Sequence, residues 1–247
     1  MIRRFLSVAA ATVFLAAMTG CGADDGSIQA KIEKARIEID ATNYDGALAT
    51  LKELCPAGVP DLISTTADFT GCGETITQLI SEARLGQSGV DFLSLLTTLD
   101  GLTPDTNTGF SIILSMLDGA GGATADSVDG LDAAIIGLTG LSSRDTSQEL
   151  SLALAYGARA VSDSMVAGGY DAATDSWTTL GGLNDAALAT RVTNDLNASV
   201  SSFNTIESAL SDTTIEAVNE LQGVVTDIGG DSTISGPELQ AFVTALP

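Results

Sequence analysis

IQAKIEKARIEIDATNYDGALATLKEL, residues 28–54, carries two apolar stripes on either side of a polar break. The first stripe has its apolar residues three or four positions apart: Ile28, Ile32, Ala35 and Ile39. The break is Asn43-Tyr44-Asp45-Gly46, and the second stripe follows it: Ala47, Leu48, Leu51 and Leu54. Because this spacing matches the turn of an α-helix, the stretch predicts two amphipathic helices that form a hairpin.

The same helical period extends over most of the chain between glycine-rich breaks. It predicts further helices near 74–85, 88–99, 109–118, 126–140, 147–166, 183–210, 213–226 and 238–246. Strict alternation of apolar and polar residues is scarce, and no turn signal joins two β-rich runs. The predicted class is therefore all-α. Ala, Gly, Ser and Thr dominate the helices, so we expect an array or bundle of short helices that approach one another closely.

The turn of the first hairpin, Ala41-Thr42-Asn43-Tyr44-Asp45-Gly46-Ala47-Leu48, resembles that of a tetratricopeptide repeat. In that family a G-D-Y-x-x-A-L pattern opens the second helix, and here Asn43 replaces the usual acidic residue. The resemblance implies a surface that binds another protein. No second copy follows at the family's period of about 34 residues, and such arrays generally need about three repeats. A divergent repeat and an ordinary helical hairpin are therefore both open.

The N-terminal segment resembles the signal of a bacterial lipoprotein. Arg3 and Arg4 are followed by an apolar run, residues 5–17, that is too short for a comfortable membrane span. Met18-Thr19-Gly20-Cys21 then resembles a lipobox, in which the cysteine receives lipid. The resemblance implies that residues 1–20 are removed and that Cys21 becomes the acylated N-terminus. An ordinary secretory signal with an incidental cysteine is the alternative.

These motifs divide the chain into three parts. Residues 1–20 are the signal peptide, residues 21–27 are a lipidated tether, and residues 28–247 form a single all-α domain. A glycine-rich run near 119–125 is a candidate break between two lobes. Gly22 stands where many two-membrane bacteria have Asp in lipoproteins retained at the inner membrane. We therefore expect an outer-membrane anchor, with the body in the periplasm or on the cell surface.

Composition disfavours several functions. The chain has 32 acidic residues, 10 basic residues and no histidine, and its net charge is −22; removal of the signal leaves eight basic residues and a net charge of −24. Without histidine there is no Ser–His–Asp or Cys–His pair and no histidine ligand for zinc. Nucleic acid is not an expected partner, because its binding begins with Lys and Arg neutralising phosphates. Adaptation to a salty medium and a specific function of the acidic surface explain the negative net charge equally well.

Two cysteines remain after export, Cys55 and Cys72. The compartment is then oxidising, so the pair predicts one structural disulfide that closes an irregular loop. A redox-active pair is the alternative, although the C-x-x-C spacing typical of such pairs is missing.

The C-terminal stretch Asp227-Ile-Gly-Gly-Asp-Ser-Thr-Ile-Ser-Gly-Pro-Glu238 resembles an EF-hand calcium loop. Its candidate ligands for Ca²⁺ are Asp227, Asp231, Thr233, Ser235 and Glu238. Gly229 and Ser232 depart from the family at positions 3 and 6 of the loop. Ser235 and Glu238 also form an S-x-x-E capping box for the last helix, so a helix cap without metal is the alternative.

Other polar features carry weaker signals. Asp126, Asp129 and Asp132 lie three residues apart and predict one acidic stripe on a helix, which is typically a solvated face. Trp177 is expected to anchor packing between helices rather than stack a ligand. The sequence lacks the glycine-rich phosphate and dinucleotide motifs and the G-x-S-x-G nucleophile motif.

The sequence thus favours a non-catalytic lipoprotein that acts as a helical scaffold for another protein of the cell envelope. The alternative is a periplasmic module that binds a hydrophobic ligand or assists transport, with Ca²⁺ as a stabilising ligand. In that case the small-residue helices at 109–118 and 133–141 would line an apolar cavity. A hydrolase that uses carboxylates alone is the third hypothesis.

Overall fold

The computed structural model describes residues 26–55, 69, 71–90, 117, 122–209 and 233–245. The α-helices within these ranges are α2 (Ile28–Asp40), α3 (Tyr44–Lys52), α4 (Glu74–Gln87), α7 (Ala125–Thr139), α8 (Thr146–Gly168), α9 (Ala186–Ile206) and α11 (Gly236–Ala245). Two 3₁₀-helices, η2 (Leu180–Asn184) and η3 (Glu207–Ala209), flank α9. The strands β1 (Tyr170–Asp171) and β2 (Ser176–Trp177) form a short antiparallel ladder. The all-α prediction is confirmed.

Side-chain caps explain where several helices begin. The Ser27 hydroxyl accepts a hydrogen bond from the Ala30 amide at the start of α2, and Asn43 does the same for Gly46 at the start of α3. Reciprocal capping boxes open α7 and α8. In α8 the box is formed by Asp145 and Gln148. Each cap satisfies amides that the first turn of a helix leaves without an intrahelical partner.

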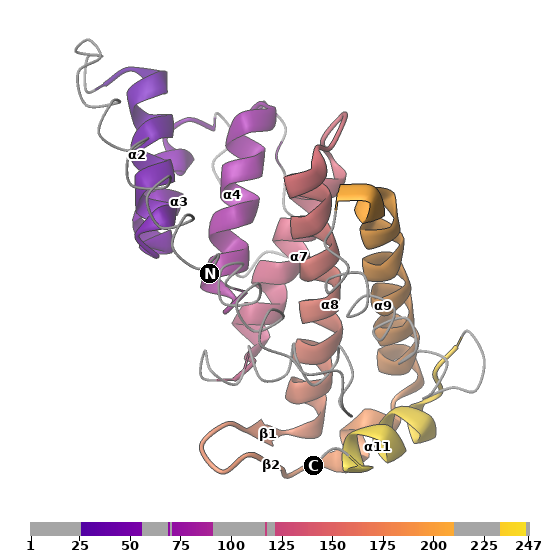
Figure 1. Ribbon diagram of the computed structural model, residues 1–247. Helices are drawn as coiled ribbons and strands as arrows, with labels where there is room; N and C mark the ends of the chain where they lie inside the picture. Colours follow the sequence, from indigo (N-terminus) through magenta and orange to yellow (C-terminus); the bar gives the residue numbers. More distant parts are fainter. Residues whose placement is uncertain are drawn as a thin grey trace, which may run out of the picture.

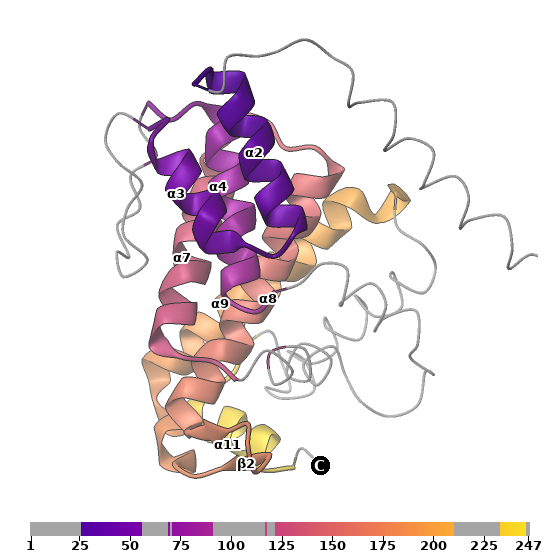
Figure 2. The ribbon, with the colours of Figure 1, turned by 90° about the vertical axis from the view of Figure 1, so that its left-hand side faces the viewer.

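The helices form a row in which each one packs against its neighbour along the chain. α2 packs on α3, α3 on α4, α4 on α7, α7 on α8, and α8 on α9. We call the packed pairs α2/α3, α4/α7 and α8/α9 the three hairpins. α4 also contacts α2 and α8, so the first helices of the three hairpins lie side by side. In Figure 1 the hairpin of α2 and α3 lies at one flank and α9 at the other, and Figure 2 views the row from the α2 flank. Side chains from neighbouring helices therefore come together on faces that cross several helices.

The described apolar side chains form two core clusters. The first lies between α2, α3 and α4 and contains the fully buried residues Ala35, Leu51 and Ile80. The second begins with Leu85 in the last turn of α4 and continues through α7, α8, α9 and α11. Both clusters therefore include residues of α4. Its first turns face the first cluster, and its last turn faces the second cluster. Residues 119–121, within the predicted lobe break, lie outside the described part, and the domain division stays a prediction.

The structure differs from the sequence-based expectation after α8. The helix ends at Gly169, whose φ of 61° is the left-handed conformation that glycine adopts without strain. The chain then turns back through β1 and β2, with Tyr170 paired to Trp177. Their rings lie 4.9 Å apart between centroids, and the Trp177 ring also packs against Gly168. The sequence predicted a packing role for Trp177 but not this ladder, because strands of two residues have no detectable alternation.

The helices predicted near 88–99, 109–118 and 213–226 fall outside the described part except at residues 88–90 and Leu117. α4 ends at Gln87, so residues 88–90 do not begin a helix. None of the helices within the described ranges is both long and apolar enough to span a membrane.

Candidate interaction surface

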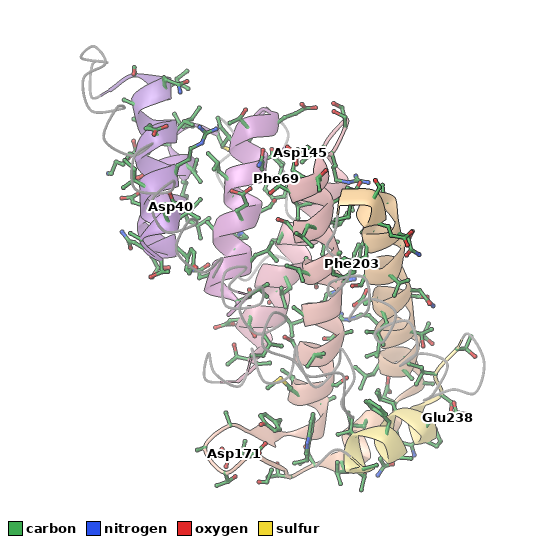
Figure 3. All side chains as sticks on the ribbon, in the orientation of Figure 1. Asp40, Phe69, Asp145, Asp171, Phe203 and Glu238 are labelled. Carbon is green, nitrogen blue, oxygen red and sulfur yellow. A yellow bond between two sulfur atoms is a disulfide. The ribbon has the colours of Figure 1, made fainter. Side chains whose placement is uncertain are left out.

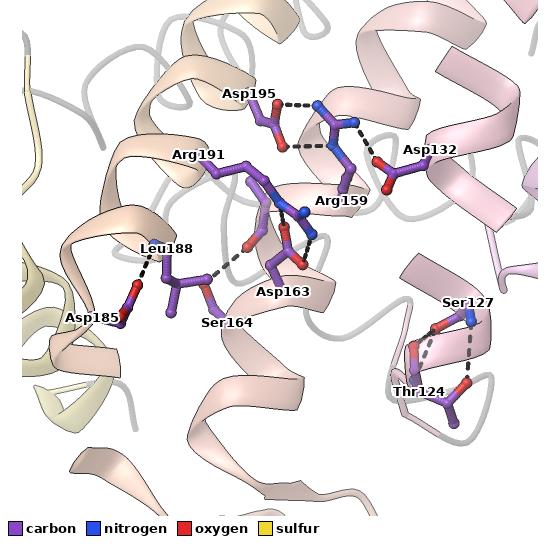
Figure 4. Close-up of polar contacts among 11 residues, drawn as sticks. Thr124, Ser127, Asp132, Arg159, Asp163, Ser164, Asp185, Leu188, Arg191 and Asp195 are labelled. Atoms are coloured by element: carbon purple, nitrogen blue, oxygen red, sulfur yellow. Dashed lines mark hydrogen bonds and ion pairs between the residues drawn. The ribbon is translucent and has the colours of Figure 1, made fainter. Parts of the chain in front are cut away.

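An ion-pair network joins α7, α8 and α9, and its members are largely buried except for Arg191, whose side chain is 44% exposed (Figure 4). Arg159 of α8 binds Asp195 of α9 through two hydrogen bonds, Nε to Oδ2 at 2.8 Å and Nη2 to Oδ1 at 2.5 Å. Its Nη1 binds Asp132 of α7 at 2.5 Å. One helical turn further along α8, Asp163 accepts two hydrogen bonds from Arg191 of α9. The network therefore ties α8 to both of its neighbours.

The environment of the network explains the charge states of its members. Burial raises the pKa of Asp195 and of Asp163 above the ordinary aspartate value. The adjacent guanidinium groups lower each pKa, but they offset only part of the increase. Burial also opposes the charge on Arg159, but its hydrogen bonds and charge interactions with Asp195 and Asp132 outweigh burial and raise the pKa of Arg159. Each charged group of the network is paired with a group of opposite charge, so we interpret the network as a structural link between helices.

A second set of polar side chains crosses the row on one face. We call it the polar strip: Arg36 of α2, Gln78 and Glu82 of α4, and Asp145 and Gln148 at the start of α8. The Gln148 amide donates to Gln78 at 2.8 Å, and the Gln78 amide donates to Glu82 at 2.9 Å. In Figure 3, Asp40 on α2 and Asp145 on α8 are labelled on the two sides of α4. The polar strip thus runs over the first helix of each of the three hairpins.

Glu82 is the half-buried centre of the polar strip. Burial raises its pKa above the ordinary value of 4.5, while the Gln78 hydrogen bond and the charge of Arg36 lower it. The carboxylates of Asp145 and Asp40 raise it further. Negative charge from α2 and from the start of α8 therefore acts on this carboxyl of α4, and Arg36 is the cation of the strip that offsets it.

The raised pKa of Glu82 predicts how stability depends on pH. Because the folded-state pKa exceeds that of the unfolded chain, the bound proton stabilises the fold below the unfolded pKa near 4.5, and this contribution is lost as pH rises through the folded pKa. Glu82→Gln removes the charge, so we expect it to raise the unfolding midpoint relative to wild type at neutral pH and to lose that advantage in acid. Thermal unfolding across this pH range measures the difference.

Glu33→Gln is the matched control, because it changes the net charge equally at a side chain that is 61% exposed. An equal response of the two variants would show that the effect comes from net charge alone and would contradict the assignment to Glu82.

The structure describes the second half of the predicted calcium loop. The Glu238 carboxylate accepts hydrogen bonds from the Ser235 amide at 2.8 Å and from the Ser235 hydroxyl at 2.5 Å. The buried Ile234 donates its amide to the Thr193 hydroxyl on α9, which fixes the start of α11. Thr233 precedes this contact, while Asp227 and Asp231 lie outside the described residues. The Ser235–Glu238 contacts belong to a helix cap, and the calcium site stays a prediction.

We expect Glu238→Ala to lower the free energy of unfolding by about 1 kcal/mol in EDTA, because the cap needs no metal. Equal stability of the variant and the wild type in EDTA would contradict the cap. If Ca²⁺ raises the unfolding midpoint of the wild type and Asp227→Ala abolishes that rise, the loop also binds Ca²⁺. If the wild type has equal midpoints in Ca²⁺ and in EDTA, the loop is a turn and a helix cap without metal.

Of the predicted site residues, Cys55 and Cys72 are brought together in a disulfide, with a Cα–Cα distance of 4.5 Å, as the sequence predicted. Cys21 lies outside the described residues, so its acylation stays a prediction. Among the residues that the structure does describe, no three Asp, Glu or Cys side chains are grouped as ligands for one metal ion.

Compared with protein-family models, with curated proteins and with solved structures, the chain matches none. Its function must therefore be argued from its own chemistry.

Sequence reasoning did not single out the polar strip. Two local signals for it exist: Gln78 and Glu82 are four residues apart on one helix face, and Asp145-Thr-Ser-Gln148 has the spacing of a capping box. Neither signal shows that α4 and α8 lie side by side. The strip forms only because these two helices are in contact, and the sequence does not reveal this.

Proposed function

We propose that the protein is a non-catalytic, lipid-anchored scaffold of the cell envelope that binds another envelope protein along the polar strip. The observation that carries the proposal is the row of three hairpins whose first helices meet on one face. Stacked helical hairpins offer extended surfaces of this kind, and such surfaces are used to bind proteins. The tetratricopeptide-like turn at 41–48 agrees with this role.

Three further features support the proposed location. The lipobox-like sequence supports acylation of Cys21, seven positions before Ile28, and Gly22 favours transfer to the outer membrane. The Cys55–Cys72 disulfide suits an oxidising compartment outside the cytoplasm.

The charge of the protein indicates what kind of partner it binds. The acidic body repels anionic partners, so the expected partner presents cationic groups to Glu82 and its neighbours.

The alternative of an apolar ligand module has less support. Residues 133–141 lie mostly in α7, where Ala134 and Leu138 are fully buried in the second core cluster. Tight packing of α7 against α4 and α8 accounts for these residues without a ligand.

Site-specific photo-cross-linking in native membranes tests the scaffold. A photoreactive residue replaces Asp40, an exposed residue beside the polar strip, and a control replaces Ser201, an exposed residue of α9. We expect one discrete protein adduct from position 40, and none from position 201. The adduct should weaken when Glu82→Arg reverses the charge of the strip. No adduct from position 40, or the same adducts from both positions, would contradict the proposal.

A further inference from the structure

Glu82 differs from the other shielded carboxylates of the described residues because it has no cationic partner. Four carboxylates have side chains that are at most 15% exposed, and each binds an arginine directly: Asp132, Glu149, Asp163 and Asp195. No lysine or arginine in the described part of the chain binds Glu82 directly, and its carboxylate accepts one hydrogen bond, from the Gln78 amide. A half-buried carboxylate without a counter-ion is unfavourable in its ionised form.

The charged groups that face Glu82 from the neighbouring helices add to this cost. Asp40 of α2 and Asp145 at the start of α8 lie on either side of α4 (Figure 3), and both disfavour the ionised form of Glu82. Arg36 of α2 favours the ionised form, but only through its charge at a distance. Two carboxylates and one arginine therefore act on Glu82 from outside its own helix.

The remaining helices that pack on α4 meet it elsewhere. α3 brings two titratable side chains to the last turn of α4, where the Tyr44 ring packs against Gly86 and Asp45 accepts a hydrogen bond from Gln87. α7 packs on α4 through its glycines, which lie against serine side chains. The charge state of Glu82 is therefore controlled from α2 and α8, the two helices that complete the polar strip.

A directed chain of hydrogen bonds ends at Glu82. The Asp145 amide donates to Gln148 at 2.9 Å, and Gln148 donates to Gln78 at 2.8 Å. Gln78 then donates to Oε1 of Glu82 at 2.9 Å. Because every donor points toward the carboxylate, the bonds polarise one another in the same direction and hold the carboxylate in one place. The Oε2 atom of Glu82 has no donor among the described residues, so it is the atom at which a proton or an external cation neutralises the group.

We infer that a proton and a cationic group of the protein partner compete for the Glu82 carboxylate, so that acid releases the partner from the polar strip. This inference rests on the proposed function, because it concerns the regulation of the same surface. The arginine that neutralises each of the four shielded carboxylates is missing at Glu82, and either competitor takes its place. The two exclude each other, because a protonated carboxyl carries no charge with which the cation of the partner can pair.

The competition determines the direction and the size of the pH dependence. The partner binds the ionised form, so its affinity is highest above the folded-state pKa of Glu82. Below that pKa the affinity falls by at most about tenfold per pH unit, the limit for one proton. Burial and the two flanking carboxylates raise the pKa of Glu82 above 4.5. Release therefore begins at a pH at which ordinary exposed carboxylates are still ionised.

Photo-cross-linking at different pH values tests the competition. A photoreactive residue replaces Thr75, an exposed and uncharged residue that shares one face of α4 with Gln78 and Glu82. Position 40 is avoided, because replacement of Asp40 would itself change the charge near Glu82. In opened native membranes buffered between about pH 8 and about pH 4.5, the adduct yield is expected to fall by up to about tenfold per pH unit once Glu82 takes up its proton. Circular dichroism of the purified chain checks that it stays folded over this range.

Two variants that carry the same photoreactive residue identify the group that titrates. Glu82→Gln imitates the protonated form, so its adduct yield is expected to be low and independent of pH. Glu33→Gln removes a charge from a side chain that is 61% exposed, and it is expected to keep the wild-type pH profile. If Glu82→Gln shows the same fall in acid as the wild type, or the same yield at neutral pH, another group controls binding and the competition is overturned.

The outcomes also separate this inference from the proposed function. A wild-type yield that stays constant down to about pH 4.5 overturns the competition and leaves the scaffold intact. No adduct at any pH, from position 75 or from position 40, overturns both. NMR titration of the Glu82 carboxyl carbon in the full-length chain, assigned by its absence from Glu82→Gln, gives an independent measurement. A Glu82 side chain that stays ionised throughout the range in which the yield falls also overturns the competition.

Discussion

Arg159→Ala is expected to lower the free energy of unfolding by about 3–5 kcal/mol, the usual effect of removing one member of a buried ion pair. The side chain of Asp195 is only 3% exposed, so its carboxylate would keep a buried charge without a partner. Asp132 on α7 would lose the same guanidinium. Chemical denaturation measures the change, and the loss should appear as a lower midpoint with an unchanged dependence on denaturant.

Two controls separate the network from a general loss of arginine. Arg36→Ala removes a cation whose nearest carboxylate contact, Glu33, is 3.9 Å away on a solvated surface, and a change of at most about 1 kcal/mol is expected. Adding Asp195→Asn to Arg159→Ala should recover part of the stability, because the uncompensated charge disappears. Additive effects of the two substitutions, or a loss as small as that of Arg36→Ala, would show that the network is solvated and contributes little.

The network also shows the limit of the sequence-based prediction. The period of three predicted that Asp132 belongs to a solvated acidic stripe with Asp126 and Asp129. In the structure Asp126 is exposed, but the side chain of Asp132 is only 15% exposed and binds Arg159. The interpretation was wrong for Asp132 because helical spacing assigns a face without saying which helix covers it. With 32 acidic residues in the chain, no local pattern identifies the one that pairs with a given arginine.

The helices themselves could be predicted because their signals are local. Apolar spacing and capping residues lie within a few positions of each other, and the expected helices at 74–85, 126–140 and 147–166 correspond to α4, α7 and α8. The polar strip and the two core clusters could not be predicted. Both depend on which helices become neighbours, and that choice is made by packing between segments tens of residues apart.

Removal of the Cys55–Cys72 disulfide is expected to lower the free energy of unfolding by about 3 kcal/mol. The bridge spans 17 positions, and closing a loop of this size restricts the unfolded chain by an amount of that order. Both cysteines are buried in the first core cluster, where they join the end of α3 to the start of α4. The double variant Cys55→Ala/Cys72→Ala, compared with the wild type in chemical denaturation, measures the loss.

Reduction of the wild-type chain supplies the matched comparison, because it opens the same bridge without changing the sequence. A structural bridge predicts that the reduced wild type and the double variant unfold at similar denaturant concentrations, and that reductant leaves the variant unchanged. It also predicts that both retain the adduct at position 40, since the hydrogen bonds of the polar strip join Gln78, Glu82 and Gln148 and do not involve the cysteines. Loss of the adduct on mild reduction, with stability unchanged, would instead identify Cys55 and Cys72 as a redox-active pair, the alternative that the sequence left open.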